Sequence, residues 1–148
     1  MSYSVDVNLL VHASNRRRPN HEAATRFMSG RTREPDVLRL AWVTITGYLR
    51  LATHPSIFPV PLPPDIALAN TTARLTQTRV RVVTEGEDYR GFLDVYRTRS
   101  GVRGVRGELV PDARLAAILQ PNGVRRLYTA DPDFLGFKFL KARNPFGG

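Results

Sequence analysis

The sequence predicts an α/β fold in which a mostly parallel sheet is covered by helices on both faces. Two observations support this class. Short apolar runs of strand composition recur along the 148 residues, and stretches with the apolar spacing of helices separate them. Strands that alternate with helices form parallel sheets with helices packed on both sides. The length fits one domain over residues 1–148, without an internal repeat.

The N-terminal part begins with an apolar run from Val5 to Val11, which has the composition of a buried strand. A polar and basic loop from Ser14 to Pro19 follows it. Asn20 is a residue type that caps helices, so we expect a helix across residues 21–29.

The middle of the chain predicts two further helices. Residues 38–42 fit either a short strand or the start of a helix. From Ile45 to Ala52 the apolar residues recur at i, i+3, i+4 and i+7, which indicates an amphipathic helix that Pro55 ends. A proline-rich connector over residues 59–64 leads to a helix from Asp65 to about Gln77.

The C-terminal half continues the alternation of strands and helices. Residues 79–83 predict a core strand, and residues 89–96 repeat the helical stripe. The glycine- and arginine-containing stretch 100–107 is expected to be a flexible loop, and a helix from about Val110 to Leu119 follows it. Two more short strands complete the prediction, at residues 125–129 and 139–142.

Composition restricts the function. The chain has no cysteine, so disulfides and thiolate metal sites are excluded. It has neither a signal-peptide pattern nor an apolar stretch approaching ~18 residues, so we expect a cytoplasmic protein without membrane partners. Its net charge of +9 comes almost wholly from arginine, because Lys138 and Lys141 are the only lysines. Such a surface suits nucleic acid, although it can also dock an acidic protein.

Three aspartates lie in apolar surroundings where a charge is unusual: Asp6, Asp112 and Asp131. Asp6 and Asp131 lie within or just after predicted strands, and ligands of parallel sheets gather at the carboxyl ends of strands. Asp112 begins a helix whose apolar positions share its face, so its carboxylate is expected to point inward. We therefore expect the three to converge on one cation.

Oxygen ligands without cysteine indicate Mg²⁺ or Mn²⁺. These ions align a phosphodiester and help to generate hydroxide, while a basic rim holds the nucleic-acid backbone. Phosphodiester hydrolysis is therefore the predicted chemistry.

The chain resembles PIN-domain ribonucleases of the VapC type, the toxins of type II toxin–antitoxin systems, over essentially its whole length. The segments that carry the resemblance are Val5 to Leu10, Tyr48 to Pro55, Gly107 to Ala117, Thr129 to Phe134 and Asn144-Pro145. It implies a PIN-like, Rossmann-like α/β/α sandwich, Mg²⁺- or Mn²⁺-dependent RNA cleavage, homodimerisation and inhibition by a cognate VapB-type antitoxin.

The resemblance also implies roles for individual residues. Asp6, Asp112 and Asp131 match the catalytic, metal-binding acids. Asp133 and Glu108 are further candidate acids. Asn8 and Thr129 match polar residues that orient carboxylates.

One position departs from the family pattern. Many members carry a glutamate where this chain has Gly47, and Glu22 and Glu108 are the nearby acids that would substitute for it. An alternative function therefore stays open, in which the protein binds RNA or its antitoxin with weak or no catalysis. A DNA nuclease is a third alternative.

Overall fold

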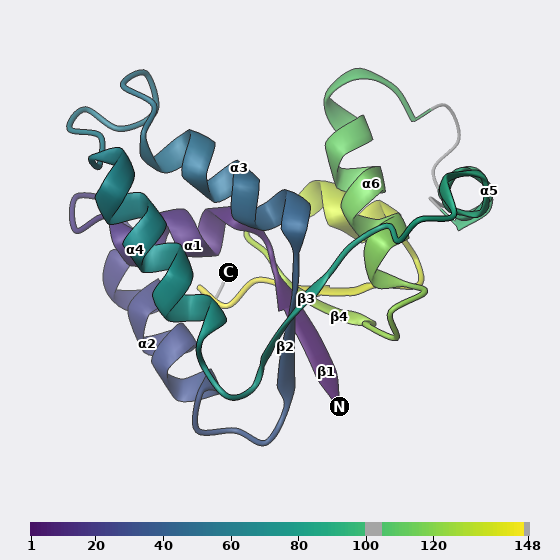
Figure 1. Cartoon of the computed structure of the whole chain (residues 1–148), viewed down its shortest axis with the longest axis horizontal. Helices are drawn as coiled ribbons and strands as arrows, with labels where there is room; N and C mark the ends of the chain where they lie inside the picture. Colours follow the sequence, from purple (N-terminus) through teal and green to yellow (C-terminus); the bar gives the residue numbers. More distant parts are fainter. Residues whose placement is uncertain (100–104, 147–148) are drawn as a thin grey trace.

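The computed structural model describes residues 1–99 and 105–146 and has three layers, with a parallel sheet between two groups of helices (Figure 1). The strand order is β3-β2-β1-β4-β5, and each neighbouring pair is parallel. The strands are β1 (Ser2–Val5), β2 (Val37–Ala41), β3 (Val80–Val83), β4 (Arg126–Tyr128) and β5 (Lys141–Arg143).

Helices cover both faces of this sheet, as the α/β/α expectation requires (Figure 1). One face carries α1 (Val7–Ser14), α2 (His21–Arg31), α3 (Trp42–Ala52) and α4 (Pro64–Leu75). The other carries α5 (Tyr89–Arg99) and α6 (Val110–Leu119), together with the short 3-10 helices η1 (Gly107–Leu109) and η2 (Pro132–Gly136). None of the helices in the described ranges has the length and apolar character needed to cross a membrane.

Two hydrophobic cores follow from the alternation of side chains along the strands. Val5 and Leu40 point to the α1–α4 side and are almost fully buried there. Leu127 points to the other side, where it packs with the buried face of α6. Because period-2 strands send neighbouring residues to opposite faces, the sheet contributes to both cores.

Most predicted elements are present, and the helix from Val110 to Leu119 has the expected bounds. Residues 37–41 adopt the strand alternative. The prediction of one strand from Val5 to Val11 is wrong, because β1 ends at Val5 and α1 begins at Val7. The Asp6 side chain accepts a hydrogen bond from the Val7 amide at 2.7 Å and caps α1, which ends the strand.

The loop predicted over residues 100–107 falls mostly on residues 100–104, which lie outside the described residues. Its end differs from the prediction, since Gly107 begins η1. Gly107 has a φ of 59°, a left-handed conformation that favours glycine.

Because the strands are parallel, their carboxyl ends all lie at one edge of the sheet, and the candidate site lies at this edge. β1 and β4 are neighbours, with Val5 opposite Tyr128. The Asp6 amide donates to the Tyr128 carbonyl at 3.0 Å, so the pairing continues one residue past β1. The residues that follow β1 and β4 therefore lie side by side.

Candidate metal centre

Thr129 joins the two strand ends. It follows β4, and its side chain is buried. Its hydroxyl donates to the Asp6 carboxylate at 2.8 Å and accepts from the Asp131 amide at 3.0 Å. Thr129 thus lies where a residue that orients carboxylates is expected.

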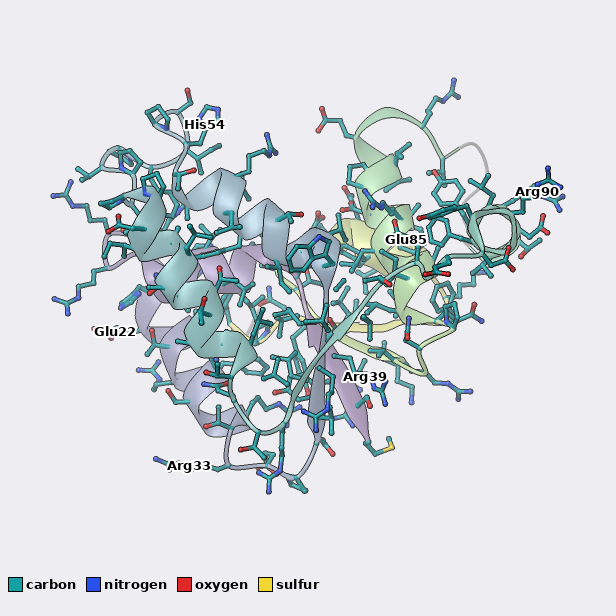
Figure 2. All side chains as sticks on the ribbon, in the orientation of Figure 1. Glu22, Arg33, Arg39, His54, Glu85 and Arg90 are labelled. Atoms are coloured by element: carbon teal, nitrogen blue, oxygen red, sulfur yellow. The ribbon has the colours of Figure 1, made fainter. Side chains whose placement is uncertain are left out.

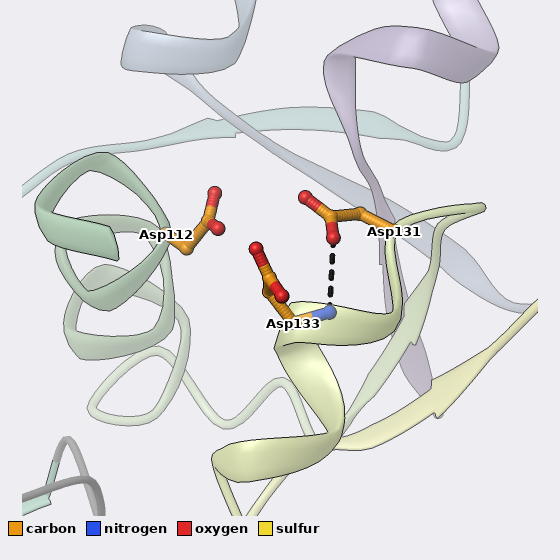
Figure 3. A group of neighbouring side chains, drawn as sticks. All are labelled: Asp112, Asp131 and Asp133. Carbon is orange, nitrogen blue, oxygen red and sulfur yellow. Dashed lines mark hydrogen bonds between the residues drawn. The ribbon is translucent and has the colours of Figure 1, made fainter. Parts of the chain in front are cut away.

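A second set of contacts gathers three aspartates. One carboxylate oxygen each of Asp112, Asp131 and Asp133 lies within 4.8 Å of those of the other two. Figure 3 shows Asp112 approaching from α6, while Asp131 and Asp133 come from the start of η2. The Asp131 side chain accepts from the Asp133 amide at 2.9 Å, and this turn brings the two residues together.

Electrostatics couples Asp6 to the same group. Burial, together with the nearby charges of Asp131, Asp6 and Asp133, raises the pKa of Asp112 to about 7. Burial also raises the pKa of Asp6, while the hydrogen bonds from Thr129 and the Val7 amide oppose the increase. The compact set thus contains two of the three expected aspartates, Asp112 and Asp131, with Asp133 as the third, while Asp6 lies close enough for its charge to act on Asp112.

No ion pair within the described residues balances the negative charge of this cluster. In residues 1–99 and 105–146, none of its four carboxylates takes part in an ion pair. Two ionised groups at 4.8 Å repel by roughly 3 kcal/mol at an effective dielectric constant near 20. The cluster must therefore hold protons or a cation, and its oxygen-only donor set fits Mg²⁺ or Mn²⁺.

The other predicted residues lie at different distances from this cluster. Asn8 is in the first turn of α1, and its amide oxygen is buried without a hydrogen-bond partner in the described part of the chain. Glu108 is exposed in η1, just before α6, and lies outside the compact trio. Figure 2 shows Glu22 on α2, on the opposite side of the molecule from α6, so it is not a substitute ligand.

Gly47 lies in α3 beside the start of α1. A Cβ added there would be 3.6 Å from the Val7 Cγ2, which is an ordinary contact. The position therefore has room for a side chain next to the residue that follows Asp6, and space alone does not explain the glycine.

Arg143 is a neighbour of the site that the sequence did not indicate. Its carbonyl accepts from the Thr129 amide at 2.9 Å. Arg143 also lines a small hollow of about 180 Å³ with Thr129, Asp131 and Asn144. The missing information was the sheet order, because the pairing of β5 with β4 is what brings Arg143 beside Thr129.

Known proteins resemble this chain in sequence and in fold. No protein-family model matches the chain. Ribonuclease VapC48 of Mycobacterium tuberculosis is 38% identical over 152 residues, an alignment that covers 100% of both proteins.

Two solved structures share the fold. VapC20 of M. tuberculosis, described as a sarcin–ricin-loop-cleaving toxin, has a TM-score of 0.68 at 20% identity and covers 96% of this chain and 99% of its own. VapBC2 of Rickettsia felis, bound to a DNA fragment from its promoter, has a TM-score of 0.66 at 14% identity over 97% of this chain and 98% of its own. With a full-length relative at 38% identity and a parallel sheet that ends in clustered aspartates, this chain belongs to the VapC family of PIN-domain ribonuclease toxins.

Proposed function

We propose that the protein is a metal-dependent endoribonuclease and acts as the toxin of a toxin–antitoxin pair. The observation that carries this proposal is the cluster of unbalanced carboxylates at the carboxyl edge of the sheet. The name of the VapC48 relative and the description of VapC20 as a toxin that cleaves the sarcin–ricin loop support RNA as the substrate class. We propose that the protein acts in the cytoplasm, where RNA of the sarcin–ricin-loop type is found.

Asp112, Asp131 and Asp133, with Asp6 beside them, are the residues that would hold Mg²⁺ or Mn²⁺. A bound ion of this type aligns the phosphodiester and makes water a stronger nucleophile. Without an ion the Asp112 carboxyl has a pKa of about 7, so near neutral pH it would release a proton when it binds the cation. Thr129 keeps the Asp6 carboxylate oriented, and the buried amide of Asn8 is a second candidate for that role.

The proposed partners are a VapB-type antitoxin and a second copy of the chain. The Rickettsia felis neighbour is a VapBC complex, which supports an antitoxin partner for a chain of this family. Co-expression with the product of an adjacent short reading frame, followed by purification, tests the first partner. Light scattering after size exclusion tests the homodimer.

Cleavage assays test the enzyme directly. Purified protein with Mn²⁺ is expected to cut structured RNA, and Asp6→Asn or Asp112→Asn is expected to abolish cutting. Asp94→Asn is a matched control, because Asp94 is exposed on α5 and pairs with Arg97. Equal cutting of a 2′-deoxy substrate would favour the DNA nuclease, and RNA binding without cleavage would favour the binding module.

A further inference from the structure

A strongly basic hollow lies along β4 and β5. It has a volume of about 540 Å³, and its lining residues include Arg125, Arg126, Lys141 and Arg143 together with Met1. We call it the β4–β5 hollow. β5 is the edge strand of the sheet, so the hollow lies at the side of the molecule.

The positive charges of this hollow are poorly balanced. Asp36 lies 3.6 Å from the Met1 amine and 3.8 Å from Arg126, so one carboxylate serves two cations. Arg125, Lys141 and Arg143 have no ion-pair partner among the described residues. No acidic side chain lines the hollow. Several cations in one concave surface indicate an anionic ligand with more than one charge.

The β4–β5 hollow shares one lining residue, Arg143, with the smaller hollow beside the candidate metal centre. Arg143 lines this hollow and also the smaller one that contains Thr129 and Asp131. An RNA strand that lies along β5 from Lys141 to Arg143 would run toward the strand end where Asp131 lies.

The hollow offers contacts to phosphates rather than to bases. Its one aromatic residue, Tyr128, is already engaged: its hydroxyl accepts from Arg31 and Arg126. The Arg31 guanidinium lies 4.8 Å from the ring centroid, and the Phe27 ring is 4.7 Å away. Without a free ring for stacking, binding here is expected to be independent of sequence.

We propose that the β4–β5 hollow binds the phosphate backbone of the RNA substrate to one side of the scissile bond. This inference rests on the proposed ribonuclease function, because RNA is taken as the substrate. It adds a binding site outside the metal centre, with Arg125 and Lys141 as backbone contacts and Arg143 as the link between the two.

The test measures RNA affinity as a function of salt. A short fluorescent single-stranded RNA is titrated, in EDTA to prevent cleavage, with wild type and with Arg125→Gln/Lys141→Gln. For single strands the slope of log K against log salt changes by ~0.7 per phosphate contact, so losing two contacts should make it shallower by about 1.4. The matched control is Arg33→Gln/Arg90→Gln, which removes the same charge from exposed residues near the end of α2 and on α5 (Figure 2).

Each outcome has a defined meaning. Arg125 and Lys141 are exposed, so their replacement should leave the unfolding temperature near that of wild type. Equal slopes for the hollow variant and the control would overturn the proposal. So would unchanged RNA binding with weakened binding of purified antitoxin, which would assign the hollow to the protein partner. A shallower slope in a protein that never cuts RNA would support the hollow while the ribonuclease proposal fails.

Discussion

The Asp112 carboxyl should make the metal-free protein less stable as pH rises. Its pKa is 3.8 when unperturbed and about 7 in the folded protein, so folding strengthens its hold on a proton. The resulting stabilisation is complete below pH 3.8, declines as pH rises toward 7, and is gone above that value. Asp112→Asn removes the titrating group and should remove this dependence.

The size of the effect follows from the two pKa values. Each pH unit between them corresponds to about 1.4 kcal/mol, so roughly 3 kcal/mol would be lost between pH 5 and pH 8 for a fully buried group. Asp112 is only half-buried, and solvent screening reduces this loss to roughly 1–2 kcal/mol. For a chain of this length the loss corresponds to a Tm lower by about 3–6 °C at pH 8.

The assay is thermal and urea unfolding in EDTA at pH 5 and pH 8. Wild type and the exposed-acid control Asp94→Asn should lose stability over this interval by about 1–2 kcal/mol more than Asp112→Asn. Mn²⁺ should raise the wild-type Tm more at pH 8 than at pH 5, because Asp112 must lose its proton to bind the ion. The same pH dependence in wild type and Asp112→Asn would refute the reasoning.

Three further changes test the surroundings of the cluster by urea unfolding. Thr129→Val leaves the partners of the Thr129 hydroxyl without a hydrogen bond and should lower the free energy of unfolding by about 1–3 kcal/mol. Thr129→Ser keeps the hydroxyl and should retain most of this stability, so equal losses for the two variants would contradict the hydrogen-bond role. Gly47→Ala should stabilise α3 by about 0.5–1 kcal/mol, because its Cβ has room, and destabilisation would reveal a hidden clash. Phe134→Ala should lower the free energy of unfolding by about 3–5 kcal/mol, because Phe134 in η2 is fully buried. A loss below 1 kcal/mol would mean that other contacts hold η2 in place.

Much of the fold was predictable because the spacing of apolar residues and the residues that begin and end helices were clear in the sequence. The helix from Val110 to Leu119 has an apolar face, with Pro111 in its first turn and Asn122-Gly123 after it. The run from Val5 to Val11 was misinterpreted because a short apolar run has no distinguishing period. The decisive signal there was Asp6, the second residue of the run and a residue type that caps helices.

The site was predictable as a set of acids, but its geometry was not. Asp6, Asp112 and Asp131 stood out because charge is unusual in apolar surroundings. The place of Asp133 depends on the turn in which Asp131 accepts from the Asp133 amide, a local contact that carries no sequence periodicity. Arg143 and the β4–β5 hollow depend on strand order, which only long-range pairing determines.

The four carboxylates are held in different ways, and this difference explains why Asp112 should respond most to a cation. Asp6 accepts from Thr129 and Val7, and these hydrogen bonds favour its charged form, while Asp131 accepts from the Asp133 amide. Asp112 has no such donor among the described residues, and it comes from α6 on the opposite side of the cluster. A cation bound between them would replace the proton on Asp112 and tie α6 to the ends of β1 and β4. Because the residues from Leu115 to Leu119 are almost completely buried, α6 presents Asp112 from a rigid support, and ion affinity should depend on how that helix packs.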